Sequence, residues 1–249
     1  MRVTAERRNA MRNTILVIAI ALVMVLATGI VLAQKTTAPG PMKPTVKAPP
    51  TVSDSELMDQ ASPYVADQPD MHFQRARENF VKRAGKASAE EIRTGAAYVK
   101  IEAVRAQGDS KRALMKSAQE LDALADGVER GTVTSVKDLD ATFARADHAL
   151  ANHHYVKASE AWSKKESKKT GYEMRASANH LERSAAWAGH KTKTSTATVL
   201  RDTKTTGEKL IHGTGTVTSD VGKGINNLGK EIQEVGKKTT TSKTGTSKK

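Results

Sequence analysis

The sequence predicts an all-α protein: an antiparallel, Ala-rich helical bundle of about four helices, with a hydrophobic helix before it and an amphipathic helix after it. Three observations lead to this fold class. No proline, the strongest helix breaker, occurs from Asp70 to Lys249. The same stretch is rich in Ala, Glu, Lys and Arg, which favour helices. Its apolar residues recur at steps of three and four, the spacing of one helix face.

Residues 1–33 have the pattern of a signal peptide or a membrane anchor. The stretch from Ile15 to Ala33 carries no charge, and four arginines precede it: Arg2, Arg7, Arg8 and Arg12. Cleavage after Ala33 is one interpretation. A helix over this stretch would be roughly 28 Å long, close to the ~30 Å of a bilayer core, so an uncleaved anchor is the other. Both predict a chain exported to the periplasm, either free there or anchored in the inner membrane facing it.

Residues 34–70 form a predicted Pro-rich linker, and residues 71–190 the predicted bundle. Five of the seven prolines lie between Pro39 and Pro50, which favours an extended tether. Apolar stripes in the bundle repeat every seven residues, as in a coiled coil, and short connections favour antiparallel neighbours. The stripes are led by Phe73, Ile92, Leu114, Leu139 and Met174, and each ends near a glycine or a charged stretch.

Polar residues at the expected helix starts predict where these helices begin. Ser88 and Ser135 each open a box-like sequence with an acidic residue soon after, and Asp109 follows a glycine. The stripe that begins at Leu139 extends through Tyr155 and Trp162, which allows one long helix.

Residues 191–238 are predicted to form a Thr/Lys-rich linker or weak helix followed by an amphipathic helix. Residues 239–249 are predicted to be a disordered basic tail. The amphipathic helix has an apolar seam and lysines away from it: Val221, Ile225, Leu228, Ile232 and Val235, with Lys223, Lys230 and Lys237. Its glycines weaken it by about 1 kcal/mol each relative to alanine. The seam either packs on the bundle or folds against a membrane or partner helix.

Candidate chemistry is sparse. The chain has no cysteine, which excludes disulfides, thiolate metal sites and thiol nucleophiles. We find no catalytic constellation and predict neither an enzyme nor a cofactor. The histidines at 148, 153 and 154 diverge on a helix, because one residue turns it by about 100°. No intrahelical metal motif is present, so the sequence assigns no metal site. An inter-helix site from His148 and His180 is the one candidate.

The net charge is +13, and residues 191–249 carry twelve basic and five acidic side chains. This basic C-terminal arm is predicted to bind an anionic membrane surface or envelope polymer, or to dock on a partner helix. Export and the lack of a recognition module argue against nucleic acid. We therefore predict a non-enzymatic exported protein of the bacterial cell envelope, a binding or structural module whose C-terminal arm contacts an anionic surface or partner. The alternative is a periplasmic bundle that binds a metal or small ligand through inter-helix histidines.

Overall fold

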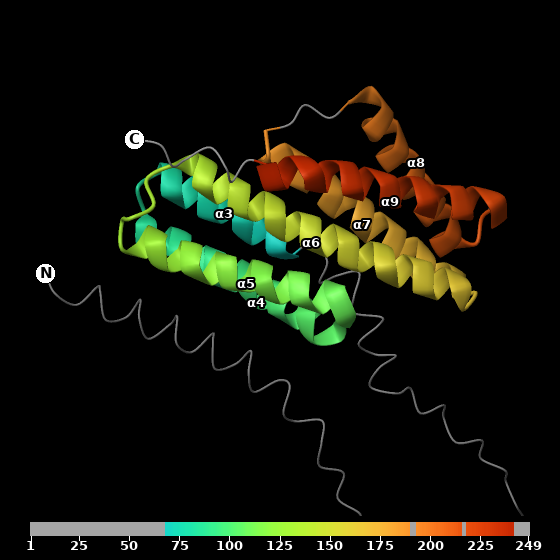
Figure 1. Ribbon diagram of the computed structural model, residues 1–249, viewed down its shortest axis with the longest axis horizontal. Coiled ribbons are helices and arrows are strands. Elements are labelled where there is room, and N and C mark those ends of the chain that lie inside the picture. The colour runs from blue at the N-terminus through green and yellow to red at the C-terminus, as the bar shows by residue number, and fades with distance from the viewer. Residues whose placement is uncertain (1–67, 190–192, 216–217, 242–249) are drawn as a thin grey trace, which may run out of the picture. The chain divides into compact units, whose positions relative to one another are not determined.

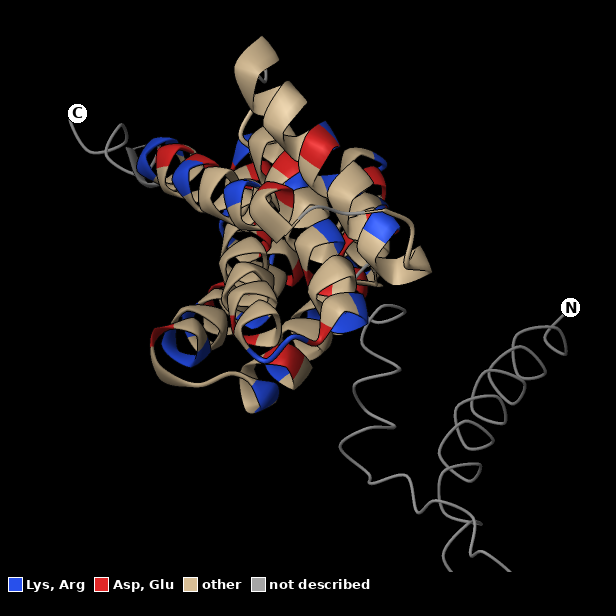
Figure 2. Ribbon diagram, turned by 90° about the vertical axis from the view of Figure 1, so that its right-hand side faces the viewer, with Lys and Arg blue, Asp and Glu red and all other residues tan. Residues whose placement is uncertain are grey.

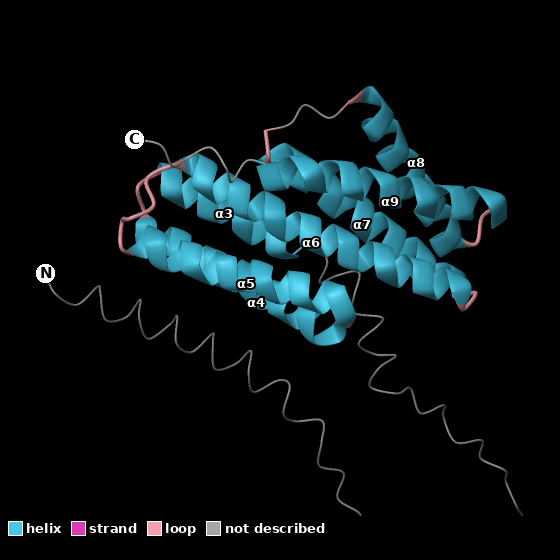
Figure 3. Ribbon diagram, viewed as in Figure 1, coloured by secondary structure: helices cyan, strands magenta, loops and turns pink. Residues whose placement is uncertain are grey.

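The computed structural model describes residues 68–189, 193–215 and 218–241, and this part of the chain is all-helical, with no strand (Figures 1 and 3). These residues form a bundle of seven helices. The sequence predicted about four helices in the bundle and one amphipathic helix after it. The seven helices are α3 (Gln68–Val81), α4 (Gly85–Arg105), α5 (Gly108–Glu129), α6 (Val136–Ser163), α7 (Ser167–Trp187), α8 (Thr194–His212) and α9 (Thr218–Thr241).

Every helix packs against the next one in sequence, and α6 also contacts α3, α4 and α9. The side-chain pairs show that neighbours run antiparallel. Arg93 on α4 contacts Glu129 on α5, while Lys100, further along α4, contacts Asp122, earlier on α5. The short links explain this, because a connection of a few residues can only join adjacent helix ends. The long helix expected from the stripe at Leu139 is confirmed as α6, the centre of the bundle.

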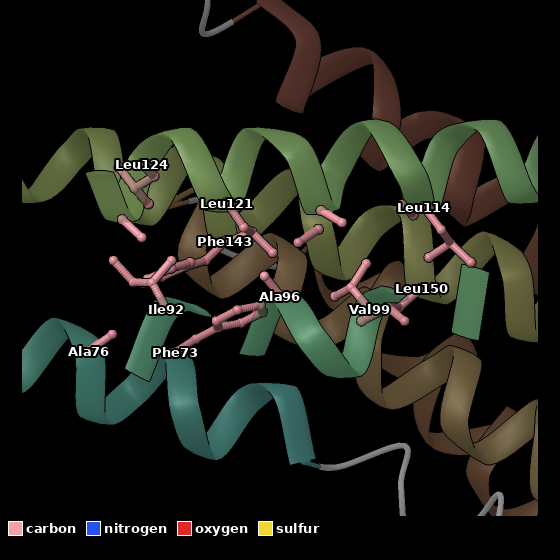
Figure 4. Close-up of a cluster of buried hydrophobic side chains, with 14 of the residues drawn as sticks. Phe73, Ala76, Ile92, Ala96, Val99, Leu114, Leu121, Leu124, Phe143 and Leu150 are labelled. Carbon is pink, nitrogen blue, oxygen red and sulfur yellow. The ribbon is translucent and has the colours of Figure 1, made fainter. Parts of the chain in front are cut away.

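Helices α3 to α6 enclose the larger apolar core (Figure 4). Phe73 of α3 stacks on Phe143 of α6 with ring centroids 4.6 Å apart, and Trp187 meets Phe143 edge-on. Leu114 and Leu121 of α5 close this core and are fully buried. The residues that lead the first four apolar stripes all lie here, so heptad spacing identified this core correctly.

Helices α8 and α9 complete the bundle over α6 and α7. Leu200 and Leu210 of α8 are buried with the apolar residues of α9 against Ala151, Met174 and other residues of α6 and α7. The Thr-rich segment expected to be a linker or weak helix is thus a regular helix of 19 residues. Burial of its few leucines outweighs its modest helix propensity, as tertiary contacts commonly do.

Two glycines of α9 mark close approaches of its backbone to α6. A Cβ at Gly229 would lie 2.8 Å from the hydroxyl of Tyr155, and one at Gly236 would lie 2.7 Å from the imidazole of His148. The sequence suggested that such glycines only weaken the helix. In the structure they leave space for two large side chains of α6, so packing compensates part of the free-energy cost of placing glycine in a helix.

Two of the three predicted helix starts differ from the structure. Ser88 lies inside α4, whose N-cap is Ala84, and its hydroxyl donates to the Ala76 carbonyl of α3. Asp109 lies in the first turn of α5 rather than at its N-cap. Ser135 is the N-cap of α6, where its hydroxyl accepts from the Lys137 amide. Thus Ser88 joins two helices instead of capping one.

The predicted N-terminal hydrophobic helix, residues 34–67 of the predicted linker and residues 242–249 of the predicted tail lie outside the described residues. Residues 239–241, where the disordered tail was expected to begin, belong to α9. Among the described helices, none is long and apolar enough to cross a membrane. The described bundle begins at residue 68, slightly before the expected boundary, and continues past residue 190. Acidic and basic residues are interspersed along its helices (Figure 2).

Candidate metal centre

A seam of buried polar side chains runs between α6 and α7, beside the apolar cores. Ser177 and Ser184 of α7 donate to the carbonyls of Ala151 and Ala144 on α6, and both hydroxyls are buried. His180 lies between these two serines on α7, and Glu173 lies one turn before Ser177. The four α7 positions follow one helix face, at residues 173, 177, 180 and 184. Burying this face requires a matching polar face on α6, because an unpaired buried polar group costs a few kcal/mol.

Three potential metal ligands meet within the seam, where His180 lies between Ser177 and Ser184 on α7. Asp70 comes from the first turn of α3, Asp147 from the middle of α6 and His180 from α7. One ligand atom from each lies within 4.8 Å of the other two, and all three residues are buried. The Nδ1 of His180 donates to Asp147 Oδ1 at 2.8 Å and lies 3.9 Å from Asp70 Oδ2. The consecutive helices α6 and α7 and the distant helix α3 thus hold a compact donor set of one imidazole and two carboxyl groups.

The two carboxyl groups have more acceptor capacity than the protein satisfies. Oδ1 of Asp70 and Oδ2 of Asp147 are buried, and neither has a conventional hydrogen-bond partner among the described residues. The two carboxyl groups hydrogen-bond each other when one is protonated, and Trp187 hydrogen-bonds Asp147. Burial raises the pKa of Asp70, and the neighbouring charge of Asp147 raises it further. Burial likewise raises the pKa of Asp147 against the opposing charge of Arg183. Two adjacent buried carboxylates repel each other, so the pair favours holding a proton or gaining a cation.

On the Ser177 side of this cluster, the seam continues through paired imidazoles. The ring of His154 stacks on that of His180, with centroids 5.5 Å apart and planes 6° from parallel. Nδ1 of His154 donates to Glu173 at 2.6 Å, and Lys157 contacts the other oxygen of Glu173 at 2.8 Å. On the other side of α6, Nε2 of His153 lies 3.3 Å from Oε2 of Glu102. Lys157 and the two imidazoles face the glutamates of this second group, which therefore has the character of a structural network.

Cationic neighbours keep the two glutamates of this network ionised. Burial acts to raise the pKa of Glu102, but the hydrogen bond from His153 and the charges of His154 and Lys157 outweigh it and lower that pKa to about 2. Burial is similarly outweighed at Glu173 by His154 and Lys157, which lower its pKa to about 2. Burial lowers the pKa of His153 against the opposing influence of Glu102. Removing a glutamate would leave a buried partner unpaired.

We expect Glu102→Gln to reduce the acid sensitivity of the fold. Glu102 titrates near 4.5 when unperturbed and near 2 in the folded protein, so its stabilisation is complete above pH 4.5 and is lost as the pH falls towards 2. The groups facing it are His153, His154, Lys157 and Arg105. The free energy of unfolding of the variant should be lower at pH 7 by up to roughly 3 kcal/mol, and the difference should shrink towards pH 2.

Urea denaturation of the full chain between pH 2 and 7 measures this difference. Glu90→Gln, on the exposed side of the same helix, is the control and should keep the wild-type profile. A constant difference between Glu102→Gln and wild type at all pH values would show that the Glu102 carboxylate is not selectively stabilised.

A cavity of about 450 Å³ lies beside the Asp70–Asp147–His180 cluster. Its lining includes Asp70 itself, Arg183, Trp187, and the carboxylates of Glu78 and Asp140. Arg183, one turn after His180 on α7, forms an ion pair with Asp70 and is about 30% exposed. The cavity therefore reaches one ligand of the cluster, which offers a route for a small ion.

The structure separates His148 and His180, the two histidines expected to form an inter-helix site. His180 belongs to the buried cluster, but His148 does not. His148 donates from Nε2 to the Ile232 carbonyl of α9 at 2.8 Å, and its ring packs against Gly236. Asp147, the residue next to it, turns towards His180 instead. Adjacent helix positions differ by about 100°, so only one of the two can face α7.

The expected contact residues of the C-terminal helix lie in two environments. All five seam residues, Val221, Ile225, Leu228, Ile232 and Val235, are buried against α6, α7 and α8. Lys223, Lys230 and Lys237 are exposed, and Lys237 contacts Glu234. The apolar seam is therefore covered by the bundle, and in this arrangement an anionic surface would meet only the lysines.

Comparison of the chain with protein-family models, with curated protein sequences and with solved structures returned no significant match.

Proposed function

We propose that this chain is an exported, non-enzymatic binding protein whose helical bundle holds one divalent metal ion between α3, α6 and α7. The observation that carries the proposal is the buried cluster of Asp70, Asp147 and His180, with a ligand atom from each within 4.8 Å of the others. The uncharged stretch at 15–33 and the preceding arginines support export.

The local charges favour a cation there. Two buried carboxylates repel each other, and within the described part of the chain one oxygen of each has no conventional hydrogen-bond partner. A divalent ion would neutralise both carboxylates and use these oxygens, replacing the proton that the pair otherwise holds.

The donor set points to a first-row transition ion. An imidazole nitrogen with two carboxylate oxygens suits Zn²⁺ or Mn²⁺ better than Mg²⁺, which prefers oxygen ligands and several waters. Three protein ligands leave at least one coordination position for water. Affinity should therefore follow the order Zn²⁺, then Mn²⁺, then Mg²⁺.

Isothermal titration of the untagged full chain, after treatment with a chelator, tests the proposal. We expect one Zn²⁺ per chain. Asp147→Asn keeps the shape and the acceptor for His180 but removes a charge, and His180→Gln removes the imidazole. Each variant should weaken Zn²⁺ binding by at least about a hundredfold, because a three-ligand site loses one ligand. His212→Gln, at an exposed histidine, is the matched control and should bind as wild type does.

Two results would contradict the metal site. One is the absence of stoichiometric Zn²⁺ or Mn²⁺ binding by the wild-type chain. The other is binding that survives Asp147→Asn and His180→Gln but is lost in His148→Gln, which would place the ion near α9. Circular dichroism of each variant confirms that it is folded before binding is compared.

A further inference from the structure

Arg183 occupies the position of a counterion at the edge of the buried cluster. Its guanidinium pairs with Asp70, while His180, three residues earlier on the same helix, contacts Asp147. The Asp70 side chain is only 5% exposed, so the pair lies in a region of weak screening. In the folded chain, this guanidinium compensates charge that a divalent ion would also compensate.

We infer that Arg183 is the resident cation of this site and that a divalent ion binds by displacing its guanidinium from Asp70. The inference rests on the proposed function, because it concerns the same cluster. An ion coordinated by Asp70 would bring at least two positive charges next to the guanidinium. Two cations at such short range repel each other, and Asp70 cannot fully serve both.

The cavity beside the cluster provides a place for the displaced side chain. Arg183 lines this cavity of about 450 Å³, and its side chain is about 30% exposed. Glu78 and Asp140 also line it, and although Asp140 already pairs with Arg77, a guanidinium turned away from Asp70 would remain near negative charge. The displacement then needs a rotamer change rather than a movement of α7.

The consequence is an affinity limited by competition within the chain. Part of the free energy of binding the ion is spent on breaking the Arg183–Asp70 pair, so removing Arg183 should tighten metal binding although it removes a residue of the site. The same competition should discriminate against monovalent ions, which gain less from two carboxylates than a divalent ion does.

Titration of full-length Arg183→Gln with Zn²⁺ tests the inference. We expect a dissociation constant at least about tenfold lower than that of wild type. Arg183→Lys keeps the charge and should stay within about threefold of wild type. Arg175→Gln is the matched control: Arg175 lies on the same helix but pairs with Glu208 of α8 and does not line the cavity, so its removal should leave the affinity unchanged.

Thermal melting gives a second measurement. Metal-free Arg183→Gln should melt below wild type, and saturating Zn²⁺ should raise its melting temperature more than it raises that of wild type. If this variant is unfolded without metal, refolding on addition of Zn²⁺ supports the inference and continued unfolding overturns it.

The inference alone is overturned if the wild-type chain binds Zn²⁺ through Asp147 and His180 but Arg183→Gln binds Zn²⁺ equally tightly or more weakly. Arg183 would then support the ligands instead of competing with the ion. If neither wild type nor Arg183→Gln binds Zn²⁺, the proposed function fails together with the inference.

Discussion

Leu228→Asp should lower the free energy of unfolding by about 4 kcal/mol or more. Leu228 is fully buried in α9 among residues of α6, α7 and α8, including Ala151, Leu181 and Leu200. The change removes a leucine from a packed site and places a carboxylate there without a partner. If α9 were a mobile arm with an exposed seam, the same change would have little effect.

Asn227→Asp is the matched control for Leu228→Asp. It introduces the same carboxylate one residue earlier, at an exposed position of α9. Guanidinium denaturation of both full-length variants, followed by circular dichroism, compares their stabilities. We expect Asn227→Asp to remain within about 0.5 kcal/mol of wild type. Equal stabilities for the two variants would mean that the α9 seam does not pack on the bundle.

The sequence predicts the apolar part of this fold well because that information is local. Leu121 and Phe143 each belong to a stripe with a three- and four-residue period, and both are buried where that period places them. Likewise, Ser135 caps α6 through an interaction with a residue two positions away. Such features depend on neighbours in the chain, so a single sequence contains them.

The candidate site depends on information that no local pattern carries. Asp70 falls in a segment that its prolines mark as a linker, and its contacts with α6 and α7 arise only from packing. Asp147 lies on α6, which is surrounded by five other helices, so polar residues on its faces are buried as well as apolar ones. The spacing of Glu173, Ser177, His180 and Ser184 is the one signal that could have indicated a buried polar face.

Gly207→Val should destabilise the protein by about 3 kcal/mol or more. Helices α7 and α8 make a close backbone contact at Gly171 and Gly207. A Cβ at Gly207 would lie 2.7 Å from the Gly171 carbonyl oxygen, and one at Gly171 would lie 2.5 Å from the Gly207 carbonyl oxygen. Both obstacles are backbone atoms, so no side-chain rotation relieves them and the helices must separate.

Separation at this contact would also uncover Leu200 and Leu210 of α8, which adds a loss of apolar burial to the steric cost. Gly222→Val on α9 is the matched control, because no atom lies within 4 Å of a Cβ built there. Valine has a better helix propensity than glycine, so this variant should be as stable as wild type or a few tenths of a kcal/mol more stable. If thermal melting showed the same small change for both valine variants, α8 would not be held against α7 at Gly207. The Thr-rich segment 194–212 would then be a peripheral helix, which is closer to the linker that its composition predicts.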